Sequence, residues 1–268
     1  MPQGRQKERN KRNNMNVILI TGASSGIGME FAMQMDNYFS NVDEFWLVAR
    51  TRDKLKEVAG VLQHKTRIFA IDVTDKPKLD MLESELREKD AVVRILVNCA
   101  GYGLLGSFAN LDRERALGMI RLNCEALTDV TSRLLPFMRK NSRIIQLASS
   151  AAFMPQPNFA VYAASKAYVL SFSRALGIEL KRLGIYVTCV CPGPVNTPFF
   201  DIAEKDGQIL AVKKITMVNA DKVVSRALKD SCHKRPMSVC SVPIKAFNVA
   251  AKVIPHGMLL RMLESMEI

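Results

Sequence analysis

Short apolar runs alternate with longer amphipathic segments along most of the chain. The apolar runs are rich in β-branched residues and predict six strands, at residues 16–20, 44–48, 67–71, 94–97, 143–147 and 185–190. Apolar residues at helical spacing fill the segments between them, the clearest being 52–62, 76–88, 113–138 and 162–183. Strands that are apolar throughout and separated by helices are typical of a parallel sheet covered on both faces. We therefore predict an α/β fold with a doubly wound parallel sheet, in which ligands bind beyond the carboxyl ends of the strands.

The pattern becomes weaker after residue 197. A Met-containing stretch at 197–218 predicts a substrate lid, a helix follows near 221–230, and the tail at 242–268 is apolar. A chain of 268 residues suits one large domain better than two. We expect a single domain over residues 15–268, preceded by a basic extension at 1–14 that lacks apolar periodicity and is predicted to be disordered.

The net charge of +12 raises the question of an anionic partner. Residues 1–14 carry five basic residues against one glutamate, so a third of this charge lies outside the predicted domain. The extension either binds a polyanion or is a solvated segment; we favour the solvated segment and expect no nucleic-acid partner. No apolar run reaches the roughly 20 residues of a membrane span, so we expect at most peripheral membrane contact, through the tail.

Six cysteines are scattered along the chain without a CxxC pair or a Cys/His cluster. This spacing does not match that of metal ligands, so we expect no metal site. Cys189 and Cys191 lie at a predicted buried strand. We interpret the cysteines as reduced core residues of a cytoplasmic protein that has no signal peptide.

The segment at residues 21–28, TGASSGIG, lies between the first predicted strand and the first predicted helix. Glycines in such a turn let the main chain approach a pyrophosphate, while the helix N-terminus supplies N–H donors and a partial positive charge. The spacing is GxxxGxG rather than the standard GxGxxG. Its position favours a dinucleotide site in a Rossmann-like sheet over an ordinary tight turn, with contacts from Gly22, Ser24, Ser25, Gly26, Ile27 and Gly28.

The end of the second predicted strand favours NADP(H) over NAD(H). An NAD-binding protein would place an acidic side chain here for the ribose hydroxyls, but this chain has Ala49 followed by Arg50, with Arg52 two residues on. A guanidinium binds a 2′-phosphate through charge-assisted hydrogen bonds, whereas a carboxylate would repel it. The alternative for Arg50 is a solvated loop charge.

Tyr162 and Lys166 lie four residues apart at the start of a predicted long helix, and therefore on the same face. A phenol titrates near 10 in isolation, and a neighbouring fixed positive charge stabilises the phenolate and lowers its pKa. The pair is suited to acid/base chemistry. Taken alone, a tyrosine and a lysine at this spacing are more often surface residues, so the assignment depends on the other motifs.

Several motifs in a fixed order carry a resemblance to a known family. They are TGASSGIG at 21–28, Asp72-Val73 after the third strand, Asn98-Cys99-Ala100-Gly101 after the fourth, Asn123 in a helix, Ser149 after the fifth strand, YxxxK at 162–166, and Pro192-Gly193 leading to Thr197. From about residue 16 to residue 200, the chain closely resembles the classical short-chain dehydrogenase/reductases. The resemblance implies a nicotinamide-dependent oxidoreductase that interconverts a ketone and a secondary alcohol.

The resemblance also implies roles for individual residues. Tyr162 would be the general acid in reduction and the general base in oxidation, and Lys166 would lower its pKa and hold the nicotinamide ribose hydroxyls. Ser149 would hydrogen-bond the substrate oxygen; Ser150 is a rival, but the family places this serine thirteen residues before the tyrosine, as Ser149 is. Asn123 would bend its helix and hold a water in a proton relay.

Further residues are implied at the cofactor. The side chain of Asp72 would contact the adenine together with the Val73 backbone, and Asn98 would line the cofactor groove. Val195 and Thr197 would meet the nicotinamide amide. Cys99 departs from the family pattern, which often has a second asparagine at this position.

The C-terminus departs further from the family pattern, because it lacks the Gly-Gly ending of many tetrameric members. The tetramer is therefore in doubt, and a homodimer through the helices at 113–138 and 162–183 is favoured. Apolar residues at helical spacing over 244–263, interspersed with Lys245, Lys252 and Arg261, predict a helix. It would cap the substrate pocket, mediate a dimer or lie on a membrane; we favour the cap with dimer contacts.

Three functions remain open on the sequence alone. The apolar, Met-containing lid and tail favour a hydrophobic ketone such as a steroid, a bile acid or a lipid, because flexible thioethers line adaptable apolar pockets. A 3-oxoacyl reductase of fatty-acid type is the alternative enzyme. A non-catalytic dinucleotide-binding regulator is the third possibility, and the complete Asn, Ser, Tyr and Lys set argues against it.

Overall fold

The structure is a computed structural model that describes residues 14–197, 199 and 217–265. The predicted extension at 1–14 and the predicted lid at 197–218 therefore lie almost entirely outside the described residues. Seven parallel strands form one sheet in the order β3-β2-β1-β4-β5-β6-β9. They are β1 (Met15–Thr21), β2 (Glu44–Ala49), β3 (Thr66–Ala70), β4 (Ala91–Asn98), β5 (Arg143–Leu147), β6 (Tyr186–Val190) and β9 (Met237–Ser238). This confirms the predicted doubly wound α/β sheet in a single domain.

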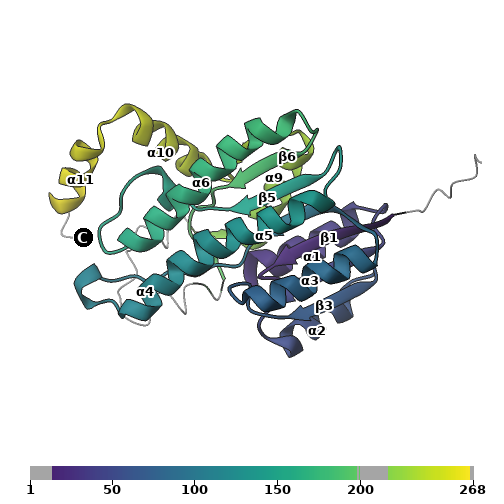
Figure 1. Cartoon of the computed structure of the whole chain (residues 1–268). Coiled ribbons are helices and arrows are strands. Elements are labelled where there is room, and N and C mark those ends of the chain that lie inside the picture. The colour runs from purple at the N-terminus through teal and green to yellow at the C-terminus, as the bar shows by residue number, and fades with distance from the viewer. Residues whose placement is uncertain (1–13, 198, 200–216, 266–268) are drawn as a thin grey trace, which may run out of the picture.

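Helices cover both faces of the sheet (Figure 1). On one face lie α3 (Lys76–Glu88), α5 (Leu127–Leu134) and α6 (Ala160–Lys181); on the other lie α1 (Gly26–Tyr38), α2 (Arg52–Val61) and α9 (Ala220–Cys232). In β1, Val17 and Leu19 belong to the first core and Ile18 and Ile20 to the second, and all four are fully buried. Two buried faces explain why the strand is apolar throughout.

The other elements lie around the carboxyl ends of the strands or follow the sheet. They are α4 (Arg113–Ile120), α10 (Val242–Val253), α11 (His256–Ser265), the π-helical turn η2 (Arg121–Ala126), the 3-10 turns η1 (Phe108–Asn110), η3 (Leu135–Phe137) and η4 (Ser150–Phe153), and the short strands β7 (Val195–Asn196) and β8 (Val218–Asn219). β7 and β8 pair in parallel. Neither was predicted, because two residues are too few to show a periodic pattern.

Two predicted helices are divided in the structure. The helix predicted at 113–138 is α4, a π-helical turn, α5 and a 3-10 turn in succession, and the 3-10 turn carries Pro136. The helix predicted over 244–263 is α10 followed by α11, broken at Ile254 and Pro255. Proline lacks an N–H group and disfavours a helical conformation in the residue before it, which explains the second break.

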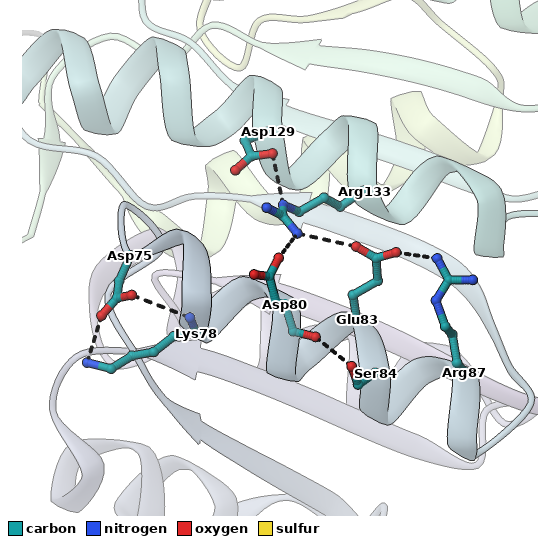
Figure 2. Close-up of polar contacts among 8 residues, drawn as sticks. All are labelled: Asp75, Lys78, Asp80, Glu83, Ser84, Arg87, Asp129 and Arg133. Carbon is teal, nitrogen blue, oxygen red and sulfur yellow. Dashed lines mark hydrogen bonds and ion pairs between the residues drawn. The ribbon is translucent and has the colours of Figure 1, made fainter.

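An ion-pair network joins α3 to α5 on the outside of the sheet (Figure 2). The guanidinium of Arg133 on α5 contacts the carboxylates of Asp80 and Glu83 on α3, and it also contacts Asp129 one turn earlier on its own helix. Glu83 also pairs with Arg87. Because several charges share these contacts, the network fixes the position of α3 against α5 better than an isolated surface pair would.

Candidate active site

The glycine-rich turn after β1 approaches the backbone of the segment after β4. Gly22 has a φ of +69°, and a Cβ at this residue would lie 2.8 Å from the backbone nitrogen of Ala100. A Cβ on Gly28 would lie 2.2 Å from the carbonyl oxygen of Gly22. Only glycine fits either position, because these neighbours are main-chain atoms that cannot move aside. The turn is thereby left open above the N-terminus of α1, as a pyrophosphate requires.

A buried threonine holds these two segments together. The Thr21 hydroxyl oxygen accepts hydrogen bonds from the backbone N–H groups of Cys99 and Ala100, both at 3.2 Å. Ala23 donates its N–H to the carbonyl of Val48 at the end of β2. The carboxyl ends of three adjacent strands are thus fixed relative to one another beneath the turn.

A cavity of about 500 Å³ lies at this edge of the sheet. Of the predicted cofactor residues, those that line it are Gly22, Ser24, Ser25, Gly26, Ile27, Gly28, Arg50, Asp72, Val73, Val195 and Thr197, together with Tyr162 and Lys166. This volume falls in the range of ligand sites in proteins. Together with the turn at Gly22 and Gly28, the lining fits a nicotinamide dinucleotide.

The end of β2 places two cations at the cavity. Arg50 and Lys54 both line it, and Arg50 forms no ion pair with the described part of the chain. Arg52, which was expected to assist Arg50, does not line the cavity; it is the first residue of α2 and is exposed. Arg50 lies in the bend before α2 and Lys54 in the first turn of that helix.

Asn98 does not line the groove, contrary to its expected role. It is 2% exposed, and its Nδ2 donates to Thr131 Oγ1 and to Gln146 Oε1, both at 3.0 Å. Its neighbours Cys99, Ala100 and Gly101 line the cavity instead. The alternating orientation of side chains along β4 turns Asn98 away from the cavity, into a polar network between β4, β5 and α5.

Three predicted catalytic side chains meet at one wall of the cavity. Ser149 follows β5, Tyr162 lies in the first turn of α6, and Lys166 lies one helical turn later. The Ser149 hydroxyl accepts a hydrogen bond from the backbone N–H of Ala151 at 3.1 Å, and both Ser149 and Tyr162 line the cavity. The Lys166 ammonium donates to the carbonyl of Leu147 at 2.8 Å and lies 5.7 Å from the centre of the Tyr162 ring.

Burial is the largest influence on the pKa values of Tyr162 and Lys166 at this wall. It raises the pKa of Tyr162 to about 12, and the nearby Ser149 hydroxyl offsets only part of the increase. Burial also lowers the pKa of Lys166 to about 8. Lys166 was expected to lower the pKa of Tyr162, whereas burial is the larger influence on the phenol in this structure. Tyr162 is consequently protonated at neutral pH and able to donate a proton.

Asn123 lies in the π-helical turn between α4 and α5 and is fully buried. Its Oδ1 accepts from the backbone N–H of Tyr102, and its Nδ2 donates to the Tyr102 carbonyl and to Ser165 Oγ. These contacts connect the helix to the loop after β4 and to α6. The resemblance implies a bend of the helix at Asn123, and the helix has a wider π-helical turn at this residue.

The substrate side of the cavity is aromatic. Phe159 stacks on Tyr162 with ring centroids 4.3 Å apart, and Phe199 lies 5.5 Å from the Tyr162 ring centroid. A Cβ on Gly103 would lie 2.8 Å from atoms of both Tyr162 and Phe199, so this glycine makes room for the rings. The aromatic rings make this wall of the cavity largely apolar.

Comparison with known proteins agrees with this geometry. The sequence profile of the short-chain dehydrogenases matches residues 16–207. The chain belongs to this family. An uncharacterized oxidoreductase of Staphylococcus epidermidis is 31% identical over 233 residues, which cover 85% of this chain and 97% of that protein. The very-long-chain 3-oxoacyl-CoA reductase of Phaeosphaeria nodorum is 32% identical over 215 residues, covering 76% of this chain and 62% of that protein.

A solved short-chain dehydrogenase from Sphingobium yanoikuyae, in complex with NADPH, has a TM-score of 0.75 and 27% sequence identity. The match covers 93% of this chain and 95% of that one. Other solved structures of this fold are complexes with NAD or NADH. The short-chain dehydrogenase fold thus accounts for dinucleotide binding, while the choice of dinucleotide depends on the residues of each chain.

Sequence reasoning missed several residues that line the cavity of this short-chain dehydrogenase. They are Thr51, Lys54, Tyr102, Gln156, Phe159 and Phe199. For Lys54 a signal existed, since it lies four residues after Arg50 in a basic segment. Tyr102 and Phe199 gave none, because aromatic residues in irregular segments have no periodicity to read.

Within residues 14–197, 199 and 217–265, no helix is long and apolar enough to cross a membrane. The same residues contain no group of three histidine, cysteine, aspartate or glutamate side chains placed to hold a metal ion. All six cysteines are free thiols, and burial raises the pKa of Cys99, which lines the cavity, to about 12.

Proposed function

We propose that this short-chain dehydrogenase is an NADP(H)-dependent enzyme that interconverts a ketone and a secondary alcohol. The observation that carries the proposal is the meeting of Ser149, Tyr162 and Lys166 at one wall of the cavity, with the Lys166 ammonium 5.7 Å from the centre of the Tyr162 ring. When bound, the nicotinamide supplies a hydride to the carbonyl carbon or accepts one from the alcohol carbon. Tyr162 gives its phenolic proton to the carbonyl oxygen in reduction and accepts a proton from the alcohol in oxidation.

The other residues of the wall act on the same oxygen or on the same proton. The Ser149 hydroxyl holds the substrate oxygen beside Tyr162 and stabilises the negative charge that develops on it. The Lys166 ammonium stabilises the phenolate that Tyr162 becomes after the proton has left. Because burial keeps Tyr162 protonated at neutral pH, the arrangement favours proton donation, and therefore reduction.

The proposed substrate is a hydrophobic ketone such as a steroid, a bile acid or a lipid. Phe159, Phe199 and Tyr102 line the substrate side and add no charge to it. A 3-oxoacyl reductase remains the second candidate, favoured by the similarity to the very-long-chain 3-oxoacyl-CoA reductase. A spectrophotometric screen of steroidal, bile-acid and acyl ketones with NADPH and NADH separates the two, and turnover of none of these classes with either cofactor would favour the non-catalytic regulator.

The proposed acid is tested with Tyr162→Phe. The change removes the transferable proton but little volume, so turnover should fall about 100-fold or more while the affinity for cofactor stays within a few-fold. Tyr38→Phe, at the exposed end of α1, is the matched control and should keep its turnover. Near-normal turnover of purified Tyr162→Phe would rule out the mechanism.

The choice of NADP(H) rests on Ala49, Arg50 and Lys54 at the end of β2. A charge-assisted hydrogen bond contributes roughly 1.5 to 3 kcal/mol, so Arg50→Gln should weaken NADPH binding about ten- to a hundredfold. Arg52→Gln is a matched control, because this neighbouring cation does not line the cavity. Adding Ala49→Asp should move the preference toward NADH. An unmodified enzyme that uses NADH as well as or better than NADPH would contradict the assignment.

The proposed assembly is a homodimer through the helices α4, α5 and α6. Leu117 and Ile120 on α4, and Tyr168 and Ile178 on α6, are large apolar side chains exposed on the protomer. Covering them would remove apolar surface from water. Sedimentation at several concentrations measures this, and a monomer at all of them would contradict the dimer.

A further inference from the structure

Helix α10 carries apolar side chains on its outer face as well as on its inner face. Ile244 and Ala251 are buried against the body of the protein. Val242, Val249 and Val253 lie on the opposite side, and they are 75%, 60% and 76% exposed. A surface helix of a globular protein ordinarily has polar or charged residues there, so α10 has an unusual outer face.

Basic residues border this apolar row. Lys245 and Lys252 are exposed on α10, seven residues apart and on one flank of the valines. On α11, Arg261 is exposed beside Met258, which is 58% exposed. α10 contains no acidic residue, and α11 contains one, Glu264, three residues after Arg261. α10 therefore combines exposed apolar surface with positive charge that has no acidic residue beside it on the helix.

The two helices are attached to the body near the cavity and project from it. Ile244 lies against Gly193, a residue of the cavity wall, and a Cβ on that glycine would be 2.9 Å from the Ile244 side chain. Phe247 contacts Phe153, with ring centroids 6.0 Å apart. Figure 1 shows α10 and α11 at the outer edge of the molecule, beyond the sheet. The inner face of α10 thus supports the cavity wall, and its outer face points away from the cavity.

We propose that the outer face of α10 and the exposed side of α11 dock on an anionic lipid bilayer. An interfacial helix inserts its apolar residues into the boundary between headgroups and acyl chains, while its lysines and arginines meet anionic headgroups. The apolar residues that insert would be Val242, Val249 and Val253. The basic residues that meet the headgroups would be Lys245 and Lys252. Docking would bring the cavity wall to the membrane surface.

The charge pattern argues against a second copy of this chain as the occupant of the surface. A symmetric contact between two α10 helices would bring Lys245 and Lys252 of each protomer together without an acidic partner on either α10. Like charges in such a contact are destabilising. This docking surface is distinct from the dimer surface proposed above, and it does not depend on the proposed reaction.

The test is flotation of the full chain with phosphatidylcholine vesicles, prepared with and without phosphatidylserine. We expect binding to vesicles that contain phosphatidylserine and at least about tenfold weaker binding to phosphatidylcholine alone, because each basic residue near an anionic surface contributes about 1 kcal/mol. Raised salt should weaken the binding, since it screens the charges.

Two double variants locate the contact. Lys245→Glu with Lys252→Glu should weaken the binding about tenfold or more. Its control is Lys222→Glu with Lys229→Glu, two exposed lysines with the same seven-residue spacing on α9. The apolar variant is Val249→Ser with Val253→Ser, and its control changes two exposed apolar residues elsewhere, Val61→Ser with Met81→Ser. Only the α10 variants should lose vesicle binding, and their circular dichroism should remain that of the unmodified chain.

Two results would overturn the proposal. Vesicle binding that is unchanged in both α10 variants would assign the attraction to another basic region of the chain, such as residues 1–14. A lower oligomeric state of the α10 variants in light scattering, without any vesicle binding by the unmodified chain, would assign the surface to a second copy.

Discussion

Glu44 and Lys166 are buried charged residues near opposite ends of the same sheet, and their surroundings differ. Glu44 is 2% exposed at the start of β2, and it receives hydrogen bonds from Arg67 and Trp46 and an ion pair from Lys65. Lys166 is 4% exposed beside the cavity, and the carbonyl of Leu147 is its one hydrogen-bond acceptor among the described residues.

The pKa values follow from these partners. Burial alone would raise the pKa of Glu44, but the hydrogen bonds from Arg67, Lys65 and Trp46 lower it to about 2. Burial of Lys166 has no such compensation and lowers its pKa to about 8. The contrast teaches that a buried charge with many partners stabilises the fold, whereas a buried charge with few partners stays available for a ligand.

The largest expected effect that tests this contrast is the loss of turnover in Lys166→Met. Without the ammonium, the phenolate of Tyr162 is no longer stabilised, and turnover should fall between about 100-fold and 10,000-fold, or about 3 to 5 kcal/mol in activation free energy. The melting temperature should stay the same or rise, because the desolvation cost of the ammonium is removed.

The pH dependence of stability gives a second check on Lys166. Its folded pKa lies below its ordinary value of 10.5, so the charged form destabilises the fold below about pH 8, and stability should rise between pH 8 and 10.5. Lys166→Met should lack this rise, and Lys181→Met, at the exposed end of the same helix, should retain it. A variant at Lys166 that loses several degrees of melting temperature but keeps its turnover would show a structural role instead.

The sequence predicted the arrangement of strands because local patterns encode it. Strands buried on both faces carry short apolar runs, such as residues 17–20 in β1 and 144–145 in β5, and β5 was predicted at its observed bounds. The two-residue strand β9 was missed, because Met237 and Ser238 follow Pro236 and form no pattern. Tyr162 and Lys166 were recognisable, because one helical turn separates them and the other motifs stand in order.

Contacts between distant parts of the chain could not be predicted in the same way. Glu44 appeared only as a charge at the start of a strand, and its partner Arg67 is 23 residues away, on the neighbouring strand. Asn98 was expected in the groove, but its neighbours Thr131 and Gln146 are 33 and 48 residues away. The identity of a side chain's partners, and hence its pKa, depends on strand register and helix packing, which no local pattern encodes.

The next smaller effect is the loss of stability in Glu44→Gln. The folded pKa of about 2 is below the ordinary value of 4.5, so the carboxylate stabilises the fold above pH 4.5, and this contribution is lost as pH falls toward 2. The shift corresponds to about 3 kcal/mol, which is the expected loss at pH 7 in Glu44→Gln.

Urea unfolding at several pH values measures the effect at Glu44. The difference between Glu44→Gln and the unmodified chain should be largest at neutral pH and small near pH 2, where Glu44 is half protonated in the folded chain and fully protonated in the unfolded chain. Glu114→Gln is the control, because that exposed carboxylate pairs with Arg121 at the surface and should change stability by less than about 1 kcal/mol. An equal loss in both variants at neutral pH would show that burial adds nothing to the Glu44 pairs.

The smallest expected effect is at Arg133, in the network of Figure 2. Its side chain is 21% exposed and faces Asp80, Glu83 and Asp129, so it has many partners but less burial than Glu44. Arg133→Met keeps most of the apolar stem and leaves the carboxylates without this cation, which should cost about 1 kcal/mol at low salt. Because salt screens the repulsion among the carboxylates, the difference from the unmodified chain should shrink as ionic strength rises.

Thermal unfolding at low and high salt measures the effect at Arg133. Arg121→Met is the control, and its single exposed pair predicts a smaller change. A loss at Arg133 that is independent of salt would assign its contribution to the packing of its stem between α3 and α5 rather than to charge.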